Sequence, residues 1–138
     1  MRKEIDLDIS EFVGIEITEL TSNRILFDKA VLDVFCSWRI YKDVVLMNPS
    51  ALLYEGENGE IAKDIVQKKI IGRKIKSIQI FEFPADIHIQ LDRGMTLEIF
   101  ADNPAFESWN LTYEGVDGRH IVSTIGGEVD WFLKEGEE

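Results

Sequence analysis

Hydrophobic and polar residues alternate along much of this chain with a period of two. The clearest stretch is 87–91, where Ile87, Ile89 and Leu91 alternate with His88 and Gln90. Successive side chains of a β-strand point to opposite faces of a sheet, so this spacing predicts a strand with one apolar face. Other segments rich in Ile, Val, Phe and Trp have the same character. The chain is therefore expected to be mainly β.

Four short sequence blocks occur twice, in the same order, and predict an internal duplication. The matched blocks are 12–20 with 70–78, 27–31 with 91–95, 32–35 with 97–100, and 37–40 with 108–111. An ordered set of matches favours duplication over the chance likeness of one strand to another. We predict a single domain, 1–138, with repeat units at about 9–50 and 70–132, joined by a loop and helix at 51–69.

Each predicted unit contains a strand after its glycine, a hairpin around an Asp turn and a strand that carries a Trp. Further strands are expected at 44–47 and 121–125. Gly94 tolerates the positive φ of a tight turn and Ala30 does not, so the two hairpin turns should differ. Helical spacing predicts one short helix that follows residues 58–60 and ends near Gly72, and 10–13 suits a helical turn.

The predicted fold class is mainly β with a minor α component. Two repeated β-meander-like units would pack as a sandwich or a partly closed barrel, with one or two short helices. A length of 138 residues, 45% of them hydrophobic and 30% charged, is typical of one folded core. Acidic residues near the N-terminus and the lack of an apolar run of membrane-spanning length predict a cytoplasmic protein with no membrane contact.

The formal net charge of −11 predicts a basic protein partner rather than nucleic acid. Such a charge repels phosphate backbones. The local exception is a group of bases within nine positions, interpreted as a solvated helix end that runs into a half-exposed strand, with a binding patch as the alternative. Its members are Lys68, Lys69, Arg73, Lys74 and Lys76.

The sequence contains none of the common linear motifs of catalysis, nucleotide binding or metal binding. We expect no catalytic residues, no metal and no cofactor, although an enzyme with a dispersed site stays open. His88 is expected on the polar face of its strand and His120 beside a loop. Asp33 and Glu98 occupy equivalent positions in the two units. They would lie on a solvated face or, as the alternative, form a carboxylate pair.

The lone cysteine, Cys36, lies in an apolar run and is expected to be a buried, inert thiol. The oligomeric state is not predicted.

The repeated Ser-Trp pairs mark the candidate binding residues, which are Trp38, Arg39, Trp109 and Asn110. Core packing explains the two rings, because each buries roughly 150 to 250 Å². The alternative is a groove that offers both rings to a partner or ligand. Trp131 has no counterpart in the first unit and is expected to cap an open end of the core.

The glycine opening, the Asp turn and the later Ser-Trp pair, repeated in one chain, resemble a class of small uncharacterised bacterial proteins. Some of these are similar to the immunity proteins of toxin systems. The resemblance implies a stand-alone intracellular protein that acts by binding, without a cofactor. The leading hypothesis is thus a non-enzymatic protein-binding module, with the immunity type as one form of it. The alternative is a small-molecule-binding protein with a site between the two repeats.

Overall fold

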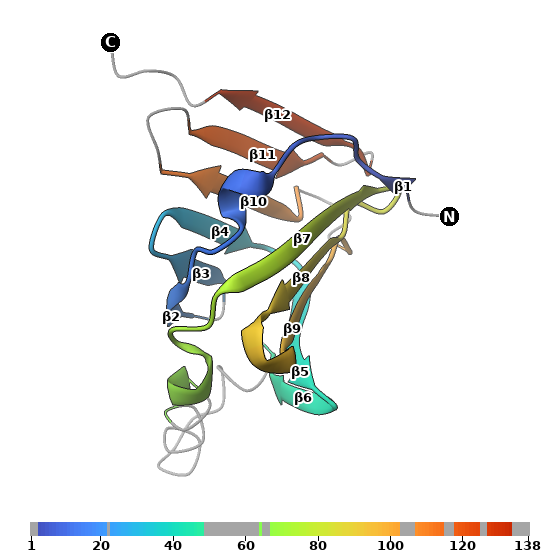
Figure 1. Cartoon of the computed structure of the whole chain (residues 1–138). Helices are drawn as coiled ribbons and strands as arrows, with labels where there is room; N and C mark the ends of the chain where they lie inside the picture. The colour runs from blue at the N-terminus through green and yellow to red at the C-terminus, as the bar shows by residue number, and fades with distance from the viewer. Residues whose placement is uncertain are drawn as a thin grey trace.

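The protein forms two six-stranded antiparallel sheets that pack together and are not closed into a barrel (Figure 1). The computed structural model describes residues 3–21, 23–48, 64, 67–102, 107–114, 118–124 and 127–133. The predicted mainly β class is confirmed, with the sandwich as the form it takes. No helix among these residues is long and apolar enough to cross a membrane.

The first sheet combines strands from both predicted units. In spatial order its strands are β1 (Lys3–Glu4), β7 (Ile75–Glu82), β8 (Ile87–Leu91), β9 (Thr96–Phe100), β5 (Ser37–Lys42) and β6 (Val44–Met47). The second sheet is also mixed. Its strands are β12 (Val129–Leu133), β11 (Arg119–Ser123), β10 (Trp109–Tyr113), β4 (Ala30–Val34), β3 (Arg24–Phe27) and β2 (Ile17–Leu20).

The two strands that carry a repeated Trp each pair with the other predicted unit. Trp38 on β5 lies opposite Ile99 on β9, and Trp109 on β10 lies opposite Val34 on β4. Each sheet is therefore completed by strands from the distant part of the chain. Both Trp strands are predicted by the sequence pattern, whereas this exchange of partners is not.

Reciprocal hydrogen bonds join the segments that precede β2 and β7. The Gly14 N–H donates to the Ile75 carbonyl at 2.8 Å, and the Gly72 N–H donates to the Ile17 carbonyl at 2.8 Å. Both glycines have positive φ, 95° and 92°, a conformation that a side chain would strain. This arrangement is what duplicated units would produce, and the duplication itself stays a prediction.

The hairpin turns differ as expected. Gly94 ends the 3₁₀ turn η2 (Asp92–Gly94) with φ of 76°, whereas Ala30 already belongs to β4 and lies opposite Tyr113. The predicted helical turn near the N-terminus is η1 (Ser10–Phe12). The predicted central helix is seen at residues 64 and 67–70, and the loops expected at 49–50 and 55–59 lie outside the described residues.

Strand alternation builds the core. On β8, Ile87, Ile89 and Leu91 are each 1% exposed, while His88 is half-buried and Gln90 is exposed. Burying one such aliphatic side chain contributes roughly 1.5 to 3 kcal/mol. The alternation read from the sequence therefore correctly identifies which face of this strand packs against the core.

An N-terminal strap, residues 3–12, connects the two sheets (blue in Figure 1). It begins as β1 on the first sheet, where the Ile5 N–H also donates to the Ile80 carbonyl at 2.9 Å. It ends at η1, whose Phe12 is fully buried and meets the Tyr113 ring edge-on at 5.5 Å. Because Tyr113 belongs to β10, the strap contacts both layers of the sandwich.

Candidate functional site

The four residues that the sequence singled out do not converge. Trp38 is 2% exposed and Trp109 is fully buried, with its indole N–H donating to the Ala85 carbonyl. Arg39 pairs across strands in the first sheet and Asn110 in the second. A partner that docks on the surface would reach Arg39 or Asn110, but neither indole ring.

The interior around Trp109 is a hydrogen-bonded polar cluster. The Ser123 hydroxyl accepts the Ser108 N–H at 2.7 Å and the Trp109 N–H at 3.0 Å. The Asp86 carboxylate accepts the Ala101 N–H at 2.8 Å. These contacts satisfy backbone groups that would otherwise be buried without partners, which assigns the cluster a role in stability.

Glu98 is the centre of an ion-pair cluster on the outer face of the first sheet. Arg39 Nε donates to Glu98 Oε1 at 2.8 Å, and its guanidinium carbon lies 5.0 Å and 5.4 Å from the ring centroids of Tyr41 and Phe100. His88 Nε2 lies 2.9 Å from Glu98 Oε2, in a direction that does not suit a hydrogen bond. The cluster holds Arg39 in place and balances its charge.

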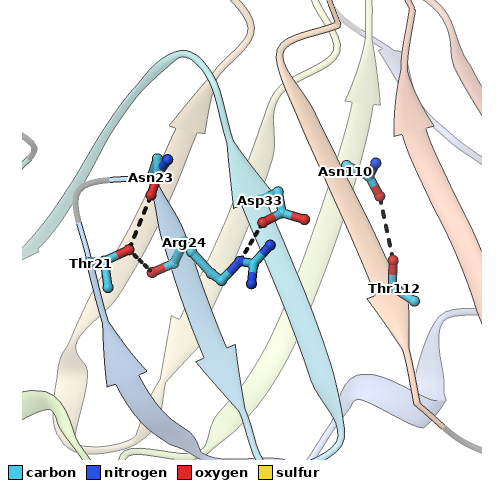
Figure 2. Close-up of polar contacts among 6 residues, drawn as sticks. All are labelled: Thr21, Asn23, Arg24, Asp33, Asn110 and Thr112. Carbon is cyan, nitrogen blue, oxygen red and sulfur yellow. Dashed lines mark hydrogen bonds and ion pairs between the residues drawn. The ribbon is translucent and has the colours of Figure 1, made fainter.

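Asp33 occupies the corresponding position on the outer face of the second sheet. Arg24 Nε donates to Asp33 Oδ1 at 2.7 Å, and Asn110 lies opposite Asp33 on β10 (Figure 2). Asp33 and Glu98 thus lie in different sheets with different partners. The alternative of a carboxylate pair is wrong, because the strand exchange places the two acids in separate layers.

A row of cross-strand neighbours runs over five strands of this same outer face. From β3 to β12 the paired residues, here called the Phe132 row, are Leu26, Val31, Thr112, His120 and Phe132. Thr112 Oγ1 lies 3.0 Å from His120 Nδ1, and the His120 ring stacks on Phe132 with centroids 5.2 Å apart. His120 is therefore the second residue of β11, close to the start of that strand.

The Phe132 row is more apolar than a fully solvated sheet face. Leu26 and Val31 are partly exposed, Phe132 is 50% exposed, and Val122 adds a further aliphatic side chain on the same face. Asp130, which is exposed, lies two residues from Phe132 on the same side of β12. Apolar groups with an aromatic anchor and a charged border are the composition of a protein contact surface.

The inner face of β12 carries a second aromatic group. Trp131 is 49% exposed, and the Arg119 guanidinium carbon lies 5.3 Å from its ring centroid. Arg119 is held by two bonds to the Glu11 carboxylate, at 2.7 and 2.8 Å, and by the Asp8 carbonyl. Trp131 thus covers the arginine that fastens the strap, with half of its surface left exposed at the edge of the sheet.

One carboxyl group and one thiol have shifted pKa values. Hydrogen bonds from Ser10 lower the pKa of Asp8. Burial and the nearby negative charge of Asp102 raise the pKa of Cys36 to about 12, so its thiol stays protonated and unreactive at neutral pH. Within the described part of the chain, no group of three or more His, Cys, Asp or Glu side chains is arranged to hold a metal ion.

The basic group at 68–76 has local partners. Lys68 Nζ lies 3.0 Å from Asp64 Oδ2, and Arg73 Nε donates to the Lys69 carbonyl at 2.8 Å. These contacts belong to the end of the central helix, in keeping with a solvated helix end. The alternative of a binding patch stays a prediction.

The Phe132 row was not predicted from the sequence, although one signal for it is present. Trp131 and Phe132 are consecutive in a segment that forms a strand, and neighbours in a strand face opposite sides of the sheet. One of two adjacent large aromatics must then lie away from the core. The cross-strand partners Leu26, Val31 and Thr112 could not be identified, because register is not readable from one strand alone.

Comparison of the chain with protein-family models, with curated proteins and with solved structures finds no match.

Proposed function

We propose that the chain is a non-enzymatic, intracellular protein-binding module that presents the Phe132 row to a basic protein. The observation that carries the proposal is Phe132 itself. Its ring is half exposed and stacked on His120 at the end of a partly apolar row that crosses five strands. A ring fixed in this way loses little side-chain freedom when a partner covers it, which favours binding.

Charge supports a basic partner. The chain has a formal net charge of −11, and Asp130 lies beside Phe132 on the same face. Charges at the rim of an apolar contact mainly raise the rate of association and exclude partners of like charge. An immunity-type role is the specific form that the sequence resemblance suggests, and in that role the basic partner is a toxin.

Affinity capture from a lysate of the source cells tests this proposal with three versions of the full chain. These are the unaltered chain, Phe132→Ser and the control Val44→Ser. Val44 is 67% exposed on β6 of the other sheet, so it tests the general effect of removing an exposed aliphatic group. Urea unfolding of each variant establishes that it is folded.

We expect the unaltered chain and Val44→Ser to capture the same basic protein, with an affinity that falls as salt rises. Loss of a central aromatic anchor costs roughly 2 kcal/mol or more, so Phe132→Ser should bind about 30-fold more weakly. If Phe132→Ser binds as well as Val44→Ser, or if the captured protein is acidic, the proposal is wrong.

A further inference from the structure

Each sheet has two edge strands, and three of the four edges are protected. β1 is only two residues long, and the pairings of β2 with β3 and of β6 with β5 each contain a register shift. Short strands and bulges are common ways in which proteins prevent another chain from adding to a sheet. β12 differs, because it pairs with β11 over five consecutive residues without a shift and contains no Lys or Pro.

Hydrogen bonding fixes which backbone groups of β12 point away from β11. The Thr124 N–H donates to the Glu128 carbonyl at 2.8 Å, which makes residues 128, 130 and 132 the ones bonded to β11. Residues 129, 131 and 133 then direct their N–H and C=O groups outward. In agreement, the Val129 N–H donates away from the sheet, to Glu82 Oε2 at 2.8 Å.

Trp131 is the middle residue of this outward set. Across the described ranges, no hydrogen bond involves its backbone N–H or C=O. The outward N–H and C=O groups of Trp131 therefore lie at the centre of a regular edge strand. The exposed side chains of this strand include the rings of Trp131 and Phe132.

We infer that β12 is the edge onto which the basic partner adds an extended segment, as a seventh strand of the second sheet. The inference rests on the proposed function and names its mode of recognition. Backbone hydrogen bonds to Trp131 give the added strand its register, and side-chain contacts on both faces give it specificity.

The side chains of β12 define what that segment contains. Its residues alternate between the two faces of the sheet. On the outer face, a Lys or Arg meets Asp130 and an apolar side chain two residues away meets Phe132. On the inner face, the residue between these two is apolar and packs against Trp131. The partner segment is thus an extended run in which one base is next to two consecutive apolar residues.

A pair of substitutions at one position separates strand addition from side-chain docking. Trp131→Pro and Trp131→Val both remove the indole, but only proline also removes the outward N–H. Proline is tolerated on an edge strand where its missing N–H faces outward, so the ladder with β11 persists. The probe is the protein captured by the unaltered chain, and binding is measured by biolayer interferometry after urea unfolding has established that both variants are folded.

We expect Trp131→Pro to bind at least tenfold more weakly than Trp131→Val. Equal binding by the two variants overturns the inference. If Phe132→Ser nevertheless binds the captured protein more weakly than the unaltered chain, the proposed function stays intact. Failure of the unaltered chain to capture any basic protein overturns the proposed function itself. If Trp131→Pro does not fold, hydrogen exchange of the Trp131 amide in the unaltered complex decides. At least tenfold slower exchange supports strand addition, and unchanged exchange contradicts it.

Discussion

Replacement of Trp109 by phenylalanine tests how much one buried hydrogen bond stabilises the sandwich. Trp109 is fully buried on β10, and its indole N–H donates to the Ala85 carbonyl. Ala85 is fully buried as well, so water does not replace the lost donor. Phe retains most of the aromatic packing, so the change separates the polar contact from the burial of the ring.

Two costs add in the Trp109→Phe variant. A buried carbonyl without a donor costs about 1 to 3 kcal/mol. The smaller ring leaves a cavity that costs roughly 1 kcal/mol at about 24 cal/mol per Å³. The free energy of unfolding should therefore fall by about 2 to 4 kcal/mol. With a urea m-value of about 2 kcal/mol/M, the unfolding midpoint should fall by about 1 to 2 M.

Urea unfolding followed by circular dichroism measures this midpoint, and Trp131→Phe is the matched control. Trp131 is 49% exposed, so the same change there should alter the free energy of unfolding by no more than about 0.5 kcal/mol. If Trp109→Phe shifts the midpoint no further than Trp131→Phe, the bond to Ala85 contributes nothing measurable and the reasoning fails.

Four further predictions concern the strap, the lone cysteine and a surface ion pair. Arg119→Met removes both bonds to Glu11, so hydrogen exchange of the Ile5 amide should become at least tenfold faster; an unchanged rate would contradict the role of Arg119 as the fastener of the strap. The pKa of Cys36, raised from 9.0 to about 12, predicts alkylation by iodoacetamide at pH 8 about 1,000-fold slower in the folded chain than in urea, and equal rates would refute it. The folded chain keeps a thiol proton that the unfolded chain loses above its pKa of 9.0, so stability should fall as pH rises from about 9 toward 12. Arg24→Met breaks a pair with Asp33 in which the arginine side chain is 53% exposed; urea unfolding should show a loss under about 1 kcal/mol, and a larger loss would mean that the pair is part of a wider network.

The period-two pattern predicted local structure well. It identified the buried face of β8, the hairpin turn at Gly94 and the strands that carry Trp38 and Trp109. These features depend on residues close together in sequence, where side-chain alternation and the conformational freedom of glycine act directly.

Pairing between distant strands was beyond the sequence pattern. The sequence around Trp38 and Trp109 is equally compatible with units whose strands pair only within the same unit. Alternation fixes the face on which a residue lies and not its neighbour on the adjacent strand. The same limit applied to the site. Asp33 and Glu98 were placed correctly on polar faces, but their cationic partners Arg24 and Arg39 depend on cross-strand register.

The exchange of strands sets the order in which the chain can fold as it is synthesised. All six strands of the first sheet have been made once residue 100 has left the ribosome. β2, β3 and β4 can pair with one another, but the other edge of β4 stays open until β10 is made, because Val34 pairs with Trp109. Closing so long a loop is slow relative to forming a hairpin. A nascent chain released before residue 109 therefore exposes the apolar edge of β4, which makes premature termination a route to aggregation for this protein.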